Sequence, residues 1–385
     1  MAGDADAILV VNAGSSSIRL AIFDGALGLQ LSGMVEGIGT RGGRLTLGET
    51  TREARFDDHA GALRALLEEC AAQGWPVARL RATAHRVVHG GADLVAPVRI
   101  DDAVLLEIRR CSPLAPLHNP HNLAAIEALR ALAPDLAHCA SFDTAFHATN
   151  PAVATTYAVP PAVTDRGIRR YGFHGISYAA LTRALPRLSG EPLPERLLAF
   201  HLGNGASLCA IRDGASVATT MGYSPLEGLT MGTRSGGIDA NAVLRLAEED
   251  GIDATHRLLN NESGLKGLSG ESPDMRRLLA SDAPAAAFAV AHFCYWATRH
   301  AGSMIAAMGG LDAVAFTGGI GEHAAPIRAR LMEALSWTGL RRDAEANDRA
   351  APRLHMTDSV IGAWIVPAEE ERAIAADALA LLGPA

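Results

Sequence analysis

The alternation of apolar and polar residues predicts that the chain opens with two strands joined by a tight polar turn. The stretch Ile8–Asp24 is apolar on both sides of a turn that begins at Asn12. This turn contains Gly14 followed by three serines. Glycine lets the backbone approach a ligand closely, and consecutive N–H groups in such a turn can form an anion-binding nest. Taken alone, the pattern fits an ordinary hairpin better than a ligand-binding turn, because short glycine motifs often arise by chance.

The same arrangement returns at Leu197–Gly214, where a turn of glycine, asparagine and serine again separates two apolar strands. Short alternating runs from Leu29 to Phe56 predict further antiparallel strands in the first sheet. Alanine and leucine at helical spacing from His59 to Cys70 predict an amphipathic helix. Two similar hairpins about half a chain apart indicate a duplicated domain with one nucleotide held between the halves.

Later segments add helices and loops to this pattern. Pro113–His121 is a proline-punctuated loop, expected to line a pocket before a helix that starts near Leu123. Helices are predicted over Ala240–Leu259 and Ala285–Met308. A third glycine turn, within Val314–His323, follows a strand and precedes a helix, where backbone N–H groups can bind phosphate. A run of carboxylates opens the last helix.

Length and charge limit the classes of partner. A chain of 385 residues exceeds one ordinary core, so two domains are expected, with a boundary near Pro151. A net charge of -8 argues against nucleic-acid and anionic-membrane partners. The apolar stretch Pro284–Ala297 is shorter than the ~20 residues of a membrane span and is expected to be a buried helix. Met1–Ala7 contains two aspartates and no basic residue, so it does not read as a secretory or mitochondrial signal.

Cysteine and lysine usage narrows the chemistry. The five cysteines are scattered singly, which fits reduced thiols in a cytoplasm and a role in packing. Lys266 is the only lysine among 34 basic residues, and Gly267 follows it. This excludes the Gly-Lys-Ser/Thr of a P-loop and makes lysine Schiff-base chemistry improbable. Arginine must therefore carry the charge if the protein handles phosphate.

Four ionisable residues stand where chemistry can use them. Arg86 lies inside an apolar segment, so it needs an anionic partner or water, and both a structural and a ligand-binding role fit. Asp143 follows a predicted strand, a position that suits a metal-bound water, a base or a helix N-cap. His174 lies beside a glycine in a cluster of aromatic and basic residues, although a lone histidine is commonly a packing residue. Arg234 is presented by a long glycine-rich loop.

The two histidines of the proline-punctuated loop, His118 and His121, have the spacing of a possible metal site. Pro120 lies between them, and no cysteine or carboxylate is close in the sequence. We therefore do not expect zinc there.

Taken in order, these motifs resemble the acetate kinase family, within the acetate and sugar kinase/Hsp70/actin superfamily. The resemblance covers nearly the whole chain. Its motifs are N-A-G-S-S-S, H-R-V-V-H-G-G, P-L-A-P-L-H-N-P, F-D-T-A-F-H, Y-G-F-H-G, H-L-G-N-G-A-S, T-M-G-T-R-S-G, F-T-G-G-I-G-E and the glutamates near the C-terminus. Each motif alone is weak, but the ordered set is specific.

This resemblance implies an α/β fold of two duplicated actin-like (ribonuclease H-like) domains with a nucleotide cleft between them. The first domain would be residues 1–150 together with the C-terminal helix at about 370–385, and the second residues 151–369. The implied reaction is reversible, direct in-line transfer of the γ-phosphoryl group of ATP to acetate, giving acetyl phosphate and ADP. The implied cofactor is Mg²⁺, with Mn²⁺ as an alternative, and the implied assembly is a cytoplasmic homodimer.

The resemblance also implies individual roles. The carboxylate and the transferring phosphoryl group would be held by Arg86, His174 and Arg234. The metal or its waters would be positioned by Asn12, Asp143 and Glu370, and Asn12 would also contact the phosphate. The methyl pocket would consist of Val88, Leu117, Phe173 and Pro225. The nucleotide would be bound by His201, Gly203, Asn204, Gly205, Asp274, Met275, Arg276, Gly318, Gly319, Ile320 and Gly321.

These residue types suit phosphoryl transfer to a carboxylate. The nucleophile is already ionised at neutral pH, so no general base is needed, and positioning and charge neutralisation dominate. Guanidinium groups match carboxylate and phosphate oxygens in bidentate fashion. A catalytic lysine is not required.

Five positions depart from the family pattern. Arg19 stands where the family usually has a lysine, Tyr178 where it has a histidine, and Gly237 where it has an aspartate. His323 and Glu369 each stand where the family usually has an asparagine. None is a proposed catalytic residue. They leave nucleotide preference and the surroundings of the metal open.

Rival functions remain at this point. A propionate or butyrate kinase is the nearest, since one methylene in such a pocket is worth only ~1 to 3 kcal/mol. An actin- or Hsp70-like ATPase acting on protein partners also fits the repeated hairpins, but would not need Arg86, His174 and Arg234 together. A sugar kinase would require a base, and Asp143 would have to serve. The sequence leaves open ATP, GTP or pyrophosphate as donor, and the physiological direction.

Overall fold

The two apolar hairpins of the sequence lie in separate units of the structure, a computed structural model that describes residues 6–383. Unit 1 comprises Met1–Phe146 and Glu369–Ala385, and unit 2 comprises His147–Ala368. Most of the segment Met1–Ala7, which is predicted not to be a signal, lies outside the described residues.

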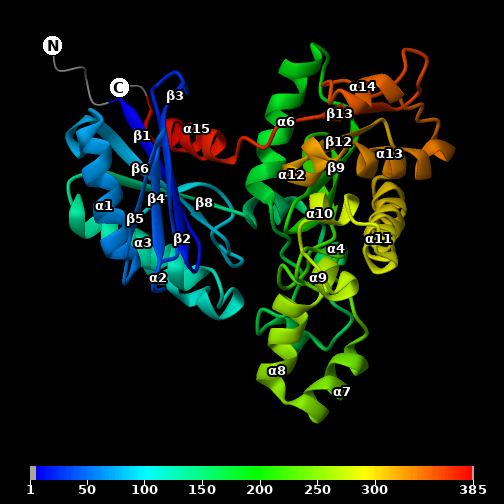
Figure 1. Cartoon of the computed structure of the whole chain (residues 1–385), viewed down its shortest axis with the longest axis horizontal. Coiled ribbons are helices and arrows are strands. Elements are labelled where there is room, and N and C mark those ends of the chain that lie inside the picture. The colour runs from blue at the N-terminus through cyan, green and yellow to red at the C-terminus, as the bar shows by residue number, and fades with distance from the viewer. Residues whose placement is uncertain (1–5, 384–385) are drawn as a thin grey trace. The chain divides into compact units, whose positions relative to one another are not determined.

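Unit 1 is built on a mixed sheet of order β5-β4-β3-β2-β1-β6-β8-β7 (Figure 1). Its strands are β1 Ala7–Ala13, β2 Ser17–Phe23, β3 Leu29–Glu36, β4 Gly43–Leu47, β5 Thr50–Ala54, β6 Leu80–Val87, β7 Val98–Arg99 and β8 Ala137–Phe142. Its α-helices are α1 His59–Ala72, α2 Asp102–Arg110, α3 Asn119–Leu132 and α15 Glu370–Leu382. The strands predicted between Leu29 and Phe56 and the helix predicted from His59 are confirmed.

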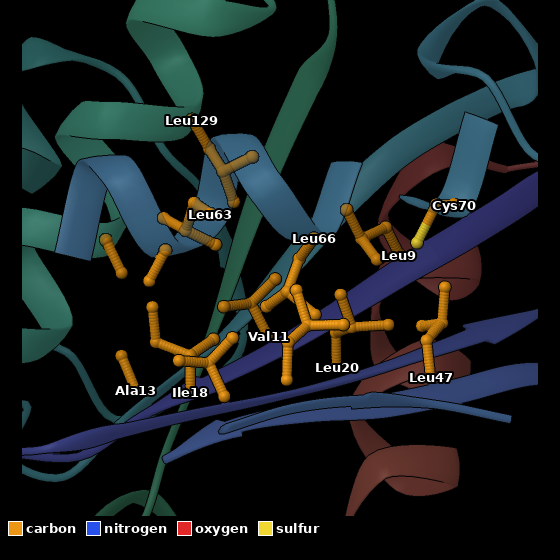
Figure 2. Close-up of a cluster of buried hydrophobic side chains, with 14 of the residues drawn as sticks. Leu9, Val11, Ala13, Ile18, Leu20, Leu47, Leu63, Leu66, Cys70 and Leu129 are labelled. Atoms are coloured by element: carbon orange, nitrogen blue, oxygen red, sulfur yellow. The ribbon is translucent and has the colours of Figure 1, made fainter. Parts of the chain in front are cut away.

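Strand β1 buries both of its faces. Leu9 and Val11 pack with Leu63 and Leu66 of α1 in one apolar cluster (Figure 2). Because successive side chains of a strand point to opposite faces, the alternate residues, including Asn12, belong to the other face. Helix α15 packs against β1, β6 and β8. A strand covered on both sides reads as a continuous apolar run, which is the pattern seen in the sequence.

Unit 2 contains a sheet of order β11-β10-β9-β12-β13. Its strands are β9 Arg196–Leu202, β10 Ala206–Arg212, β11 Ala215–Thr219, β12 Ala313–Thr317 and β13 Gly362–Ile365. Its α-helices are α4 Ala152–Thr155, α5 Pro161–Thr164, α6 Gly175–Ser189, α7 Ala240–Asp250, α8 Ile252–Arg257, α9 Gly264–Ser269, α10 Met275–Leu279, α11 Pro284–Met308, α12 Gly318–His323, α13 Ala325–Ala334 and α14 Ala344–Asp348.

The two sheets share one pairing scheme. In unit 1, β1 pairs antiparallel with β2 and parallel with β6, which pairs parallel with β8. In unit 2, β9 pairs antiparallel with β10 and parallel with β12, which pairs parallel with β13. Each unit thus repeats the order of a hairpin followed by two parallel strands, as the repeated hairpins of the sequence predict.

Three predicted elements differ in detail. The helix expected over Ala240–Leu259 is broken at Gly251, whose φ of 87° does not continue a helix, into α7, α8 and a π-helical turn over Leu258–Glu262. The helix expected near Leu123 begins at Asn119, because a proline is tolerated in the first helical turn. The glycine turn expected before a helix, within Val314–His323, itself forms the short helix α12, and the next helix, α13, follows it at Ala325.

Helix α11 is predicted to be buried, but only one face of it is. Phe288 and Tyr295 are 58% and 64% exposed, whereas Phe293 and Ala297 are buried. None of the helices within residues 6–383 combines the length and the apolar character that crossing a membrane requires.

The cysteines and the single lysine are placed as simple chemistry predicts. All five cysteines are unpaired and buried, as expected for packing residues. Lys266 lies in α9 and is exposed, with its Nζ atom 3.4 Å from the carbonyl oxygen of Asn261.

Candidate active site

Three predicted residues of unit 1 stand at the ends of neighbouring parallel strands. Asn12 is the penultimate residue of β1, Arg86 is the penultimate residue of β6, and Asp143 directly follows β8. Both β1 and β8 pair with β6 in parallel. The carboxyl ends of parallel strands form one edge of a sheet, the edge at which ligands bind in open α/β sheets. Unit 1 therefore gathers these three side chains at that edge.

Arg86 and Asp143 form a two-point ion pair. Arg86 Nε donates to Asp143 Oδ1 at 3.0 Å and Nη2 donates to Oδ2 at 2.7 Å, and the side chains are 20% and 3% exposed. Burial disfavours the charge of Arg86, but the carboxylates of Asp143 and Glu370 outweigh it and raise the pKa of Arg86. Burial raises the pKa of Asp143, and the Arg86 charge opposes that rise. Asp143 thus fixes the orientation of a permanently charged guanidinium.

The residues predicted to position a metal supply oxygen donors. Glu370 is the first residue of α15, and its charge acts on Arg86 together with that of Glu371. Amide and carboxylate oxygens from Asn12, Asp143 and Glu370 are the hard ligands that Mg²⁺ prefers. Within residues 6–383 no cluster of three or more histidine, cysteine or acidic residues suits a metal ion. Mg²⁺ commonly binds through only one or two carboxylates plus waters and substrate phosphates, so this donor set fits it.

Two buried asparagines fix the loops after β1 and β6. No role was predicted for them from the sequence. Asn122 Nδ2 donates to the Ala13 carbonyl at 2.7 Å, and its Oδ1 accepts from the Val88 N–H at 3.1 Å. Asn119 exchanges two hydrogen bonds with the His89 backbone, at 3.0 and 2.9 Å. The available signal was a pair of asparagines three residues apart at the start of an otherwise apolar helix.

The four residues predicted to form a methyl pocket divide between the units. In unit 1, Val88 is 7% exposed after β6, and Leu117 is 44% exposed before α3. In unit 2, Phe173 is 1% exposed and Pro225 is half-buried. Their grouping into one pocket remains a prediction.

His174 is held firmly within unit 2. It precedes α6 with a left-handed φ of 58°, which is rare for a residue other than glycine. Its Nδ1 lies 2.8 Å from Ser207 Oγ on β10. Its ring stacks on His201 of β9, with the centroids 4.1 Å apart and the planes 22° apart. His201 Nδ1 in turn lies 2.8 Å from Ser177 Oγ.

Arg234 and His174 converge on Gly205. A Cβ atom added to Gly205 would lie 3.2 Å from His174 Nε2 and 3.7 Å from Arg234 Nη1. Arg234 Nη1 also donates to the Pro225 carbonyl at 2.9 Å, which ties the glycine-rich loop together. Unit 2 thus brings an imidazole nitrogen and a guanidinium to the same glycine, within the turn between β9 and β10.

Replacing Gly205 by alanine tests this convergence. The added methyl group would push His174 Nε2 away by a few tenths of an ångström. Because small misplacements of catalytic groups are costly, we expect kcat to fall by roughly tenfold or more. Gly302→Ala in α11 is the matched control, since a Cβ there meets nothing within 4 Å. Unchanged steady-state turnover of the folded Gly205 variant would show that the two groups do not act at this point.

A pocket of about 480 Å³ in unit 2 collects most of the predicted nucleotide-binding residues. Its lining residues are Gly203, Asn204, Pro273, Asp274, Met275, Arg276, Leu279, Gly319, Ile320, His323, Ala324 and Pro326. The volume is within the roughly 300–1,000 Å³ typical of small-molecule sites. The other four predicted residues lie outside this lining, with His201 and Gly205 beside His174 and with Gly318 and Gly321 packed against the sheet.

Asp274 and Arg276 form one wall of the pocket as a pair. Arg276 donates from Nε and Nη2 to the Asp274 carboxylate at 3.0 and 2.6 Å, and its backbone N–H donates at 2.9 Å. These hydrogen bonds lower the pKa of Asp274 to about 2. Asp274 also caps α10, so the pair fixes the start of the helix that carries Met275.

The apolar part of the pocket was missed by sequence reasoning. Leu279, Ala324 and Pro326 line it together with Met275. The spacing of Met275 and Leu279, one helical turn apart, was the available signal. His323, one of the departures from the family pattern, also lines this pocket.

The sequence matches the profile of the Acetokinase family over residues 7–376. The chain belongs to the acetokinase family. Among curated relatives, it is 44% identical to the acetate kinase of Rhodopseudomonas palustris, with 96% of this chain and 97% of that protein covered. It is 45% identical to the acetate kinase of Deinococcus deserti, with 95% and 96% covered.

Solved structures of family members agree with this fold. The acetate kinase of Porphyromonas gingivalis matches with a TM-score of 0.91 and 32% identity, over 98% of this chain and 100% of that one. A propionate kinase of Francisella tularensis matches with a TM-score of 0.92 and 32% identity, over 97% of this chain and 98% of that one. The predicted family, the actin-like α/β fold and the expectation of a kinase are confirmed.

Proposed function

We propose that this acetokinase-family protein is a carboxylate kinase that transfers the γ-phosphoryl group of ATP reversibly to acetate, giving acetyl phosphate and ADP. A carboxylate oxygen forms the new bond to the γ-phosphorus. The bond from that phosphorus to the oxygen it shares with the β-phosphate breaks in line, and its electron pair stays on ADP. No proton has to move, because acetate is already ionised at neutral pH.

The observation that carries this proposal is the convergence of His174 and Arg234 on Gly205. The neighbouring residues Gly203 and Asn204 line the pocket of about 480 Å³. A nucleotide held there by its base and sugar would have its phosphates near the turn between β9 and β10, because Gly203 and Asn204 belong both to this turn and to the pocket lining. His174 and Arg234 then donate to the equatorial oxygens of the transferring group, where negative charge is greatest.

The unit 1 residues complete the chemistry. The Arg86 guanidinium binds the substrate carboxylate through two N–H groups. Asp143 fixes the orientation of this guanidinium. Mg²⁺ or its waters would be held by Asn12, Asp143 and Glu370, with Mn²⁺ as an alternative. The bound metal supplies charge neutralisation for the phosphates. By resemblance to the family, the methyl group would be surrounded by Val88, Leu117, Phe173 and Pro225.

A carboxylate panel tests the proposal. Purified protein with Mg-ATP and acetate is expected to form an acyl phosphate that hydroxylamine traps, and ATP consumption is expected to depend on the carboxylate. The same assay with GTP and pyrophosphate identifies the donor. Absence of trapped product from folded protein would sink the proposal, and ATP turnover without any carboxylate would favour an ATPase that acts on protein partners.

Propionate is the second candidate substrate, because a propionate kinase is among the matching solved structures. One methylene in an apolar pocket changes specificity by only about 10- to 200-fold. The ratio of kcat/KM for acetate, propionate and butyrate decides among them, and acetate is expected to have the highest value.

We further infer a cytoplasmic homodimer. The buried, unpaired cysteines support a reducing compartment. The exposed aromatic side chains of α11, Phe288 and Tyr295, support a contact with a second copy of the chain.

A further inference from the structure

The backbone around His174 is held in a strained conformation. His174 has a φ of 58° and Gly172 a φ of 84°. A buried histidine, His147, holds this turn, since its Nε2 lies 2.9 Å from the Phe173 carbonyl oxygen. Glycine adopts such a φ freely, but a left-handed histidine persists only where its surroundings enforce the conformation, and such residues occur at functional sites. The turn fixes the position of the His174 ring, but not which ring nitrogen carries the proton.

A hydrogen-bonded chain reaches His174 Nδ1 from the interior of unit 2. Tyr178, one helical turn further along α6, places its hydroxyl 2.5 Å from Ser207 Oγ. Ser207 Oγ lies 2.8 Å from His174 Nδ1. Tyr178 and Ser207 are both fully buried. Tyr178 is one of the five positions at which the sequence departs from the family pattern.

The proton positions along these hydrogen bonds follow from the hydrogen-bond partners and from the burial of Tyr178. Burial and the nearby Cys209 raise the pKa of Tyr178 well above its usual value, outweighing hydrogen bonds to Ser207 and to the His201 backbone. The phenol therefore stays protonated, and since its oxygen accepts from the His201 backbone, its own proton is directed to Ser207. Ser207 has one proton, which then goes to His174 Nδ1. A neutral imidazole that accepts at Nδ1 carries its proton on Nε2.

We propose that Tyr178 is a positioning residue which, through Ser207, holds His174 in the tautomer that presents Nε2–H beside Gly205 and Arg234. The consequence for turnover rests on the proposed function, in which Nε2 donates to the transferring phosphoryl group. The opposite tautomer would present a lone pair to anionic oxygens and repel them. A phenylalanine would fill the same volume but would leave the direction of the Ser207 proton unset.

The first test compares Tyr178→Phe, Ser207→Ala and the double variant with the native protein. We expect Tyr178→Phe to lower kcat by roughly tenfold or more, while the KM values for carboxylate and ATP change by less than about threefold, because the loss is in the transition state. The double variant is expected to match Ser207→Ala within about twofold, because both residues act along one path. Gly302→Ala in α11, where an added Cβ meets nothing within 4 Å, is the control and is expected to keep native turnover.

A second measurement is independent of catalysis. In protein labelled with ¹⁵N-histidine, the His174 signal is the one lost in His174→Gln, and its nitrogen shifts report the tautomer. We expect Nε2–H in the native protein and a mixture of tautomers in folded Tyr178→Phe and Ser207→Ala. Native kcat and an unchanged tautomer in these variants, or multiplying losses in the double variant, would overturn the inference. If the native protein makes no acyl phosphate, the proposed function fails, and the tautomer measurement alone decides about Tyr178.

Discussion

Replacing Arg234 by alanine is expected to lower kcat by about a thousandfold while the fold remains intact. Arg234 is half-buried in a glycine-rich loop, and its described hydrogen bonds to Pro225 and Met231 stay within that loop. Its Nη1 lies 3.7 Å from the point where a Gly205 Cβ would be, and His174 Nε2 lies 3.2 Å from the same point. A cation there neutralises charge that is greatest in the transition state, so its loss falls on kcat more than on KM.

Arg245→Ala is the matched control for this experiment. Arg245 lies on α7, is 71% exposed, and pairs with Glu249 one turn away. Surface pairs of this kind contribute about 0.3 to 0.5 kcal/mol, so turnover and stability should stay near native. Steady-state kinetics measures the turnover of both variants, and circular dichroism shows whether each variant is folded. A folded Arg234→Ala protein with near-native kcat would contradict the assigned role.

Replacing Arg86 by alanine is expected to abolish measurable turnover and to lower the free energy of unfolding by about 3 to 5 kcal/mol. The substitution removes the group proposed to bind the substrate carboxylate. It also leaves the Asp143 carboxylate, 3% exposed, without its two-point partner. Leaving one charge of a buried pair uncompensated costs far more than the pair itself contributes.

The loss should depend on pH with a definite sign. Burial raises the pKa of Asp143, and Arg86 is the main opposing influence. Without Arg86, the folded-state pKa of Asp143 rises further above its value in the unfolded chain. The protonated, neutral Asp143 then favours the folded state. This contribution to stability is fully present below the unfolded-state pKa of Asp143 and is lost as the pH rises through its folded-state pKa.

Urea unfolding from about pH 5 to about pH 8 measures this effect. The double variant Arg86→Ala/Asp143→Asn is the control, because it has no carboxylate to bury. It is expected to recover much of the lost stability at the higher pH, but none of the turnover. Equal stability of the single and double variants across the range would mean that the carboxylate is not the source of the loss.

The hairpins could be predicted from the sequence because their signal is local. Ile8–Asp24 and Leu197–Gly214 each show apolar runs broken by a glycine turn, and the structure has the hairpins β1–β2 and β9–β10 at these positions. The break at Gly251 was not predicted. Helix-forming residues lie on both sides of it, and a single glycine is tolerated inside many helices.

Much of the candidate site could be anticipated residue by residue, but not its connections. The position of Asp143 at a strand end is readable from the pattern, whereas its two-point contact with Arg86 depends on the register of β6 and β8. The relay from Tyr178 to His174 runs through Ser207 on a different strand, far away in the sequence. Such contacts arise from tertiary packing, which periodicity and short motifs do not encode.

The single exposed lysine, Lys266, has a chemical consequence for an enzyme that releases acyl phosphate. An acyl phosphate is a mixed anhydride, and amines attack it at the carbonyl carbon to give amides. Lysine side chains are the usual targets of such acylation, whereas guanidinium groups remain protonated and unreactive. The cations proposed for catalysis are arginines, and Lys266 is exposed in α9. The protein therefore offers its own reactive product one side-chain amine, and none among the residues proposed to act in transfer.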